Sequence, residues 1–484
     1  MRQYAEGWRT RDSRTRTLGE RPIATDGRAS AAVAGPPASA SFGASLAGLT
    51  GLARGMPWQG IAWSLPLVGL LAYIWSATTY SVPLGEPAMI VALVGLLFQR
   101  QPLRVPPFLL LFAAFVLWAA IGYTLSDYPA LVATWLDVFV RVGLIALVLV
   151  NAVRTRGEQR LFMFFFLGAY ALYPVRGTIF NYVGGYTVFG RALWNYIFAN
   201  PNDLAALTLL QLSMALALLQ REPKGWPRLA ATAGIFVLPV VILLTQSRGA
   251  IIGLAMFGVF VLTGQRKKRR LRTIVTFAAV AGVIAIFAPS SVWDRLSGLR
   301  NVTDTEQLDK VDQEGSAEQR FEIWKVASTV FADNPVMGVG LGSYASAHWE
   351  YSRSGQFKAT ARGRKDAHST YLTLLAETGA VGFLLCMSVF GVVVVRAERV
   401  RRRARRVQLI EAAQQILYLE VGLLAFFTAA IFASYSGLAF TYVHVALLWT
   451  VVTTTEEEVR LVESGPRPLA ARPAATAVRA LAHG

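Results

Sequence analysis

The sequence has little charge, one cysteine and few histidines. Of its 484 residues, 16% are charged, one is cysteine and four are histidine. The lone Cys386 excludes a disulfide framework or a cysteine metal cluster within one chain. Hydrophobic residues instead make up 54% of the chain, and the mean hydropathy is +0.44. These values lie outside the range of soluble globular domains and indicate an all-α polytopic membrane protein.

Long apolar runs recur along most of the chain. Residues 1–57 are rich in Arg, Ala, Ser, Gly and Pro, and they predict a disordered tail that cannot bury a core. From Trp58 onward, runs close to the ~20 residues that a helix needs to span a bilayer predict about twelve transmembrane helices. The predicted spans are 58–77, 86–99, 105–124, 130–151, 161–176, 203–220, 229–246, 248–264, 272–289, 370–395, 408–433 and 437–453.

Lys and Arg fall on alternate connections between these runs. Basic residues gather in the N-terminal tail and at 100–104, 154–160, 221–228, 266–272 and 396–406. Cytoplasmic loops retain positive charge, so these connections and both termini are predicted to face the cytoplasm. The net charge of +18 is therefore mostly a signal of topology. We expect membrane lipids, and no nucleic acid, beside this positive charge.

The opposite face receives short turns and one long loop. The predicted order is a cytoplasmic tail at 1–57, nine spans within 58–289, a large loop at 290–369, three spans within 370–453 and a cytoplasmic C-terminal tail at 454–484. Inside the loop, SAEQRFEIWKVASTVF has Phe321, Trp324, Val330 and Phe331 at helical spacing, which predicts an amphipathic helix. The following GVGLGSY predicts a glycine-rich turn.

Arginines on the predicted outer face are exceptions to the rule that positive charge stays on the cytoplasmic side, so each one calls for an explanation. Arg248, in TQSRGA, lies at the outer mouth of two spans, where it needs water, an acid or an anionic ligand. Arg320 lies in the first turns of the amphipathic helix, whose free N–H groups also favour an anion. Arg191 precedes the Asn-Pro-Asn turn before the next span. For each, the plainer interpretation is an interfacial, salt-bridged or ordinary loop charge.

His368 lies at the outer entrance of the tenth predicted span, just after Arg364, Lys365 and Asp366. Neighbouring cations lower the pKa of an imidazole, so the ring is expected to be neutral near pH 7 and able to accept a proton. A lone histidine is nevertheless more often a structural hydrogen-bonding residue than a catalytic one. His348, in the same loop, is a second candidate.

Two other groups of charged residues have structural interpretations. Asp137 and Arg141 are four residues apart in the fourth predicted span, so they can form an ion pair on one helix face. The acidic run at 304–314 could bind a divalent cation. Its acids lack ordered spacing, however, and such a run is more often a solvated loop.

Five short motifs follow one another in the second half of the chain. They are Gln246-Ser247-Arg248-Gly249, Arg320 with Trp324, Asn334-Pro335-x-x-Gly338-x-Gly340, Ala367-His368-Ser369-Thr370-Tyr371-Leu372 and Glu377-x-Gly379-x-x-Gly382. In order and spacing they resemble the O-antigen ligase and polymerase superfamily, and the O-antigen ligases most. The resemblance covers about 191–395. The chain departs from many relatives in its long N-terminal tail and at Ser369, where they carry Asn.

The resemblance implies a glycosyltransferase of the bacterial inner membrane with one large, mainly helical periplasmic loop. Such enzymes transfer a glycan, with inversion and without a metal or cofactor, from an undecaprenyl-pyrophosphate donor to lipid A core or another glycan acceptor. Arg248 and Arg320 match the family's two essential arginines, and His368 matches its essential histidine. We add Arg191 as a third residue for the pyrophosphate. Guanidinium groups bind phosphate oxygens well, and a neutral His368 is suited to act as a general base.

Other functions remain open at this point. A polymerase or a protein O-oligosaccharyltransferase of the same superfamily would use a different acceptor. A flippase or transporter of lipid-linked glycans would place ionisable residues deep in several spans, around a central cavity. A noncatalytic scaffold would tolerate the loss of His368.

Overall fold

The computed structural model describes residues 61–464, except 62, 80–82, 223, 266–269, 272, 276, 280–281 and 283–315. The predicted N-terminal tail at 1–57, the acidic run at 304–314, most of the predicted span at 272–289 and most of the C-terminal tail lie outside the described residues. The described part of the chain is helical, with connecting turns and one isolated bridge between Val188 and Arg191.

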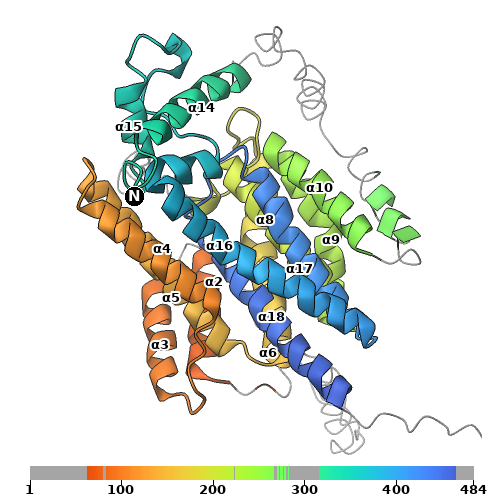
Figure 1. Ribbon diagram of the computed structural model, residues 1–484. Helices are drawn as coiled ribbons and strands as arrows, with labels where there is room; N and C mark the ends of the chain where they lie inside the picture. The colour runs from red at the N-terminus through yellow and green to blue at the C-terminus, as the bar shows by residue number, and fades with distance from the viewer. Residues whose placement is uncertain are drawn as a thin grey trace, which may run out of the picture. The chain divides into compact units, whose positions relative to one another are not determined.

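The helices follow the apolar runs of the sequence (Figure 1). In chain order they are α2 (Leu65–Thr79), α3 (Gly85–Phe98), α4 (Pro107–Tyr123), α5 (Pro129–Ala152), α6 (Arg156–Tyr170), η2 (Ala171–Val175), α7 (Arg176–Val183), η3 (Tyr196–Phe198), α8 (Pro201–Leu219), α9 (Trp226–Leu244), α10 (Arg248–Gly264), α14 (Ser316–Asp333), α15 (Tyr344–Tyr351), η5 (Ala359–Ala361), α16 (Thr370–Arg406), α17 (Ile410–Ala429) and α18 (Ala439–Ser464).

Six helical segments among the described residues are long and apolar enough to cross a membrane. They are α5, the continuous run from α6 to α7, α8, α9, α16 and α17. Four shorter apolar helices, α2, α3, α4 and α10, coincide with further predicted spans. The prediction of a helical chain with several membrane-spanning segments is therefore confirmed for the described residues, whereas the total of about twelve spans and the periplasmic position of the large loop stay predictions.

Local sequence explains where several helices begin. Pro107, Pro129 and Pro201 open α4, α5 and α8. Proline suits the first helical turn because its φ is already helical and its missing N–H would have no partner there. α6 begins instead at a capping box, in which Thr155 Oγ1 accepts from the Glu158 N–H at 3.3 Å and the Glu158 carboxylate accepts from the Thr155 N–H at 2.8 Å.

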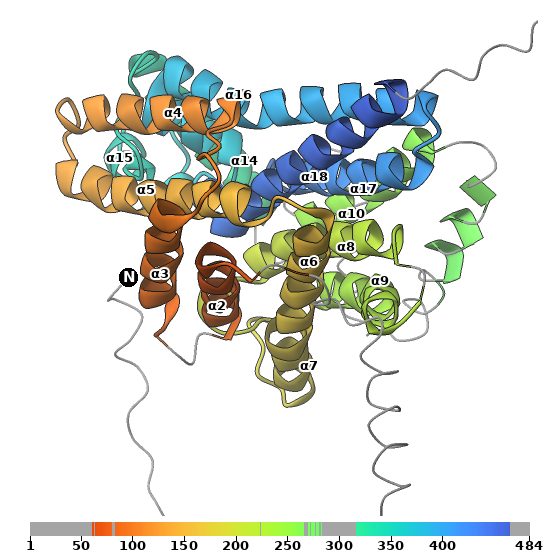
Figure 2. The same ribbon diagram turned by 90° about the horizontal axis from the view of Figure 1, so that it is seen from below.

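α8 and α17 lie at the centre of the helical bundle. In each, 83% of the apolar window is buried, against 33% in α5. α8 packs against α9 and α17, and α17 packs against α10 and α16. α16 in turn packs against α4 and α18 (Figure 2). Helices far apart in the sequence, such as α8 and α17, therefore pack side by side.

α14 and α15 form a small helical layer at the end of the bundle where α16 begins (Figure 1). The layer has its own core of Val326, Ala327, Val330, Tyr344, Ala347, Phe357, Ala361, Ala367 and Ala376. The predicted amphipathic helix is thus present as α14, but Phe321 is 54% exposed, and the Lys325 Nζ lies 4.9 Å from its ring centroid. Because Ala367 and Ala376 belong to the layer's core, folding of the layer fixes the start of α16.

The predicted glycine-rich turn fastens this layer to α16. Gly340 has φ +110°, in the left-handed region that favours glycine. The N–H groups of Val339 and Gly340 donate to the carbonyl oxygens of Ala376 and Glu377, both at 2.9 Å. The Glu377 carboxylate accepts in return from the Tyr344 N–H at 3.2 Å. The turn therefore adds a short backbone pairing to the first turns of α16.

α16 bends where this turn reaches it. Gly379 has φ +66° inside the helix, and a Cβ at this position would lie 2.0 Å from the Val336 carbonyl oxygen. The next residue, Ala380, donates its N–H to the Pro335 carbonyl oxygen at 2.8 Å. The motifs around Pro335 and Gly379 are therefore two halves of one structural contact, and only glycine fits its centre.

Candidate functional site

Arg191, Arg248 and Arg320 line one small pocket, although they come from three separate segments. Its other lining residues are Asn202, Gln246, Ser247, Gly249, Phe432 and Tyr435. The pocket holds about 20 Å³, little more than the space that one water molecule needs. Three cationic side chains around so small a space repel one another, and an anion beside them lowers that energy.

Arg191 is anchored in the loop before α8. Its Nε donates to the Thr245 carbonyl oxygen at 2.8 Å, and its Nη2 donates to the Asn202 Oδ1 at 2.6 Å. The next residue, Ala192, donates its N–H to the Leu244 carbonyl oxygen at 2.9 Å. The guanidinium group is therefore held between the last turn of α9 and the first turn of α8.

Arg248 is the first residue of α10, so the positive end of the helix dipole lies at the same place as its side chain. The turn before it has Gln246 at φ +51°, and the Gln246 Nε2 donates to the Gly190 carbonyl oxygen at 3.2 Å. A Cβ on Gly249 would lie 3.0 Å from the Phe432 Cβ, closer than most side-chain contacts. Glycine thus lets the start of α10 approach the turn after α17.

That turn connects the arginine pocket to the start of α16. The Tyr435 hydroxyl donates to the Asn202 carbonyl oxygen at 3.0 Å, and the Tyr435 N–H donates to the Thr370 Oγ1 at 2.9 Å. Thr370 Oγ1 itself donates to the Ala433 carbonyl oxygen at 2.7 Å, and the Thr370 N–H donates to the Ala430 carbonyl oxygen at 2.9 Å. Thr370, two residues after His368, is therefore joined to the turn that carries Tyr435, a lining residue of the pocket.

His368 is partly buried and has φ +49°, an uncommon conformation for a residue with a side chain. Burial lowers the pKa of its imidazole, and the positive charges of Arg320 and Lys365 lower it further, while Asp366 opposes them. The direction predicted from neighbouring cations is confirmed, although burial is the largest cause. Arg320 is the arginine whose charge reaches the histidine, so the pocket and His368 form one electrostatic unit.

His348 has a different environment. Its side chain is fully buried, its Nδ1–H donates to the Gly363 carbonyl oxygen at 2.8 Å, and its ring meets Tyr344 edge-on at 5.6 Å. Burial lowers the pKa of His348 as well. Because the ring packs inside the α14–α15 layer, we assign it a structural role.

The predicted pair of Asp137 and Arg141 is confirmed, with the Arg141 Nε 2.8 Å from the Asp137 Oδ2. Glu86 joins the pair, its Oε1 lying 2.5 Å from the Arg141 Nη1. The three side chains tie α3 to α5 and contribute nothing to the lining of the arginine pocket.

Asn202, Asp203 and Tyr435 were not singled out in the sequence. Asn202 binds Arg191 through its side chain and Tyr435 through its backbone. The next residue, Asp203, interacts electrostatically with Tyr435, and its carboxylate is repelled by that of Asp366. The Asn-Pro-Asn turn was the available signal for this group. Tyr435 had none, because one tyrosine in an apolar region is unremarkable until the fold brings it beside Asn202.

Within the described residues, His, Cys, Asp and Glu side chains form no group of three that could hold a metal ion. The charged side chains that line the arginine pocket are guanidinium groups. Such groups recognise phosphate oxygens through paired hydrogen bonds.

Residues 233–387 match the family model described as O-antigen ligase. The match covers about a third of the chain and includes Arg248, Arg320 and His368, while Arg191 and Tyr435 lie outside it. The comparison with curated proteins found no match to the chain.

Proposed function

The chain is a member of the O-antigen ligase superfamily, and from this premise we propose that it ligates an O-antigen glycan onto lipid A core. The glycan donor in this proposal is linked to undecaprenyl pyrophosphate. The reaction takes place at the periplasmic face of the inner membrane and completes a lipopolysaccharide.

The observation that carries the proposal is the meeting of Arg191, Arg248 and Arg320 in one pocket. Negative charge develops on the pyrophosphate as the glycosidic bond breaks, so donors already directed at that position stabilise the transition state. Three guanidinium groups and the N-terminus of α10 supply such donors without a metal ion. In this proposal they hold the donor's pyrophosphate and then the leaving group.

His368 is the proposed general base. Burial and Arg320 keep its pKa below the usual value, so the imidazole is neutral at pH 7 and accepts the proton of the acceptor hydroxyl. The hydroxyl oxygen forms a bond to the anomeric carbon from the face opposite the pyrophosphate. The bond between that carbon and the pyrophosphate oxygen breaks, so the configuration inverts.

The position of the site agrees with an amphiphilic donor. The pocket lies at the start of α8, at one end of a helix that is long and apolar enough to span a bilayer. A lipid carrier's headgroup lies at such a boundary, with its isoprenoid chain among the helices. The α14–α15 layer covers the same end and is available for the polar acceptor.

The test is glycan transfer from a purified lipid-pyrophosphate donor to lipid A core in the presence of a chelator. We expect the wild type to be active, transfer by His368→Ala and Arg320→Ala to fall by about 10²-fold or more, and Arg364→Ala, which removes an exposed arginine of the same loop, to keep full activity. Full activity of His368→Ala would remove the histidine from the mechanism.

The same assay separates the remaining acceptors. Transfer to a second molecule of the lipid-linked donor would indicate a polymerase, and transfer to a protein would indicate an O-oligosaccharyltransferase. Translocation of the donor without any transfer would contradict the enzymatic proposal. Among the described residues, the triad of Glu86, Asp137 and Arg141 is exposed on the bundle surface, which gives a transporter little support.

A further inference from the structure

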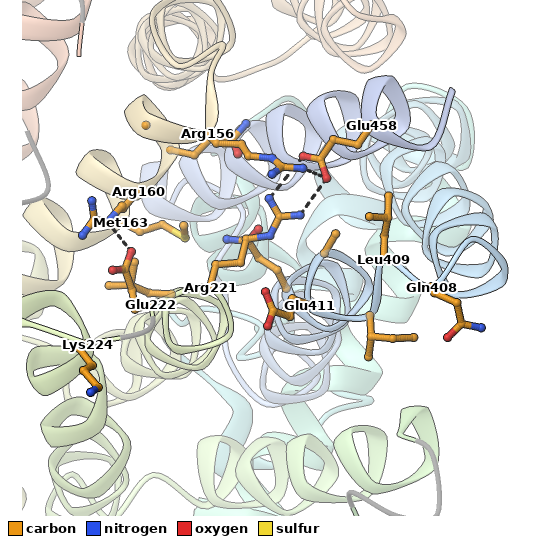
Figure 3. A pocket seen from close by; sticks show the side chains of 16 residues that line it. Arg156, Arg160, Met163, Arg221, Glu222, Lys224, Gln408, Leu409, Glu411 and Glu458 are labelled. Carbon is orange, nitrogen blue, oxygen red and sulfur yellow. Dashed lines mark hydrogen bonds and ion pairs between the residues drawn. The ribbon is translucent and has the colours of Figure 1, made fainter. Parts of the chain in front are cut away.

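A second and larger pocket, of about 810 Å³, lies where the start of α6, the end of α8, the start of α17 and the later part of α18 meet (Figure 3). α8 connects the two pockets, with Asn202 in the arginine pocket and Leu218 in this one. A helix of 19 residues is about 28 Å long, close to the ~30 Å of a bilayer's hydrocarbon core. The two pockets therefore lie at opposite ends of α8, a candidate membrane span.

Basic side chains outnumber acidic ones in this pocket. Four basic and three acidic residues line it, which leaves one net positive charge. Arg156 and Arg221 both bind the same carboxylate, that of Glu458, with the Arg221 Nη2 3.2 Å from the Glu458 Oε2 (Figure 3). Each guanidinium group has five N–H donors, so both keep donors for a further anion.

The pKa of Arg221 is lowered by its surroundings. Burial lowers the pKa of Arg221 to about 10, with a further decrease from Arg156 and an opposing increase from Glu411. Arg221 remains charged at pH 7 but shares its acid with a second cation. An anion placed between the two arginines would relieve their repulsion.

Two further features of the lining point to a phosphate group that also carries a hydrogen-bond donor. The Glu222 side chain is 3% exposed, and its Oε1 pairs with the Arg160 Nε at 2.5 Å. Its Oε2 has no hydrogen-bond partner among the described residues, so a hydroxyl from a ligand would satisfy it. α17 begins at Ile410 with no side-chain cap in the described chain, and its first turn adds positive potential.

The pocket also has an apolar wall. Met163, Leu218, Leu409, Ile410 and Ala412 line it beside the charged residues. A small soluble phosphate would leave this wall in contact with water, whereas the glycerol backbone and first acyl carbons of a lipid would cover it. The combination of charge and apolar surface is that of a headgroup boundary.

We infer that this second pocket binds the headgroup of a monoanionic phospholipid. Its phosphodiester lies between Arg156 and Arg221, and a headgroup hydroxyl donates to Glu222. One net positive charge in the lining matches one phosphodiester. The site is separate from the arginine pocket and does not depend on the proposed transfer reaction.

The experiment is native mass spectrometry of the delipidated full chain in detergent, with phosphatidylglycerol as the probe and phosphatidylcholine as the zwitterionic reference. We expect preferential retention of phosphatidylglycerol. Arg221→Gln should weaken its binding by about tenfold, the effect of losing one charge-assisted hydrogen bond. Lys224→Gln, an exposed position on the rim, should weaken it less without any effect on folding.

Glu458→Gln is the more decisive variant, because it removes the carboxylate that both Arg156 and Arg221 bind. Binding of phosphatidylglycerol should become tighter in this variant. Arg403→Gln is the matched control, since Arg403 pairs with Glu463 and Glu456 and lies outside the pocket lining. Its affinity for phosphatidylglycerol should equal that of the wild type.

Three results would overturn the inference. Equal retention of phosphatidylcholine would show that the positive charge of the pocket does not favour an anionic headgroup over a zwitterionic one. Weaker binding in both Arg221→Gln and Glu458→Gln would show that the ion pairs only support the fold. Displacement of the lipid by an equal concentration of glycerol phosphate would show that the pocket takes a free phosphate ester instead.

Discussion

The Trp324 indole Nε1 donates a hydrogen bond to the Ala367 carbonyl oxygen at 2.9 Å, across 43 residues of sequence. Trp324 lies four residues after Arg320 on α14, so the two side chains share one face of the helix. Ala367 directly precedes His368. This hydrogen bond therefore ties α14 to the residue before the histidine, whose imidazole feels the charge of Arg320 on the same helix.

Trp324→Phe tests this positioning role, because it keeps an aromatic ring and removes the N–H donor. We expect a loss of about 1 kcal/mol in the free energy of unfolding, since the Ala367 carbonyl loses its partner. The rate of glycan transfer should fall by about tenfold with little change in donor KM. Trp349→Phe, at a tryptophan that is 47% exposed on α15, should change neither quantity. A wild-type rate in Trp324→Phe would contradict the role.

Glycine is required at Gly379, where α16 bends, but not at Gly391 later in the same helix. Gly379→Ala would place a Cβ 2.0 Å from the Val336 carbonyl oxygen at a positive φ, so we expect a loss of about 2 kcal/mol or more. Gly391→Ala, in the same helix, would meet nothing within 4 Å and should stabilise the helix by up to about 1 kcal/mol. Thermal unfolding in detergent measures both. Equal midpoints for the two variants would argue against the bend as a structural requirement.

The acidic limb of the pH–rate profile should follow the charges around His368. Because the folded-state pKa lies below the ordinary 6.5, the rate should hold at pH 7 and fall only as the pH drops through that lower value. Lys365→Gln removes a charge that lowers the pKa and should move the limb to higher pH, whereas Asp366→Asn should move it to lower pH. Profiles of kcat/KM against pH would show the two shifts. Shifts in the same direction would mean that another group controls the limb.

The same pKa shift has a consequence for stability. The unfolded chain protonates His368 at its ordinary pKa of 6.5, while the folded protein resists protonation until the pH is lower. The unfolded state therefore binds more protons in that range, and stability falls as the pH drops below 6.5. His368→Gln should remove this part of the pH dependence of the free energy of unfolding. A pH dependence identical to the wild type would exclude the contribution.

The three arginines should differ in what their loss does. Arg248→Ala and Arg320→Ala should reduce transfer by about 10²- to 10³-fold, the effect of losing a donor to developing charge, while the protein still folds and inserts. Arg191→Ala should also lower the unfolding midpoint, because Arg191 holds Thr245 and Asn202 together. Transfer rates and thermal midpoints measured side by side would separate the two effects. Wild-type activity in Arg248→Ala and Arg320→Ala together would exclude pyrophosphate binding at this pocket.

Helix positions and the candidate residues could be predicted because their signals are local. Apolar runs of the right length mark α5, α8, α9 and α17, and prolines mark where several helices begin. Arg248, Arg320 and His368 stand out because charge is rare on the face predicted to lie outside and because the family motifs surround them. The predicted burial of Phe321 in the apolar face of its helix is wrong. Spacing identifies an apolar stripe, but the Phe321 ring contacts Lys325 and solvent instead of a core.

The sequence by itself determined a largely helical chain with apolar segments of membrane-spanning length and the candidate residues Arg248, Arg320 and His368, because hydropathy, charge and motif spacing are properties of short segments. Only the tertiary structure decided that Arg191 shares a pocket with Arg248 and Arg320 and that Tyr435 and Asn202 complete it. It likewise decided that Glu458 pairs with two arginines, Arg156 and Arg221, near the far end of α8. These contacts join helices distant in sequence, and their geometry depends on how α8, α16 and α17 pack together.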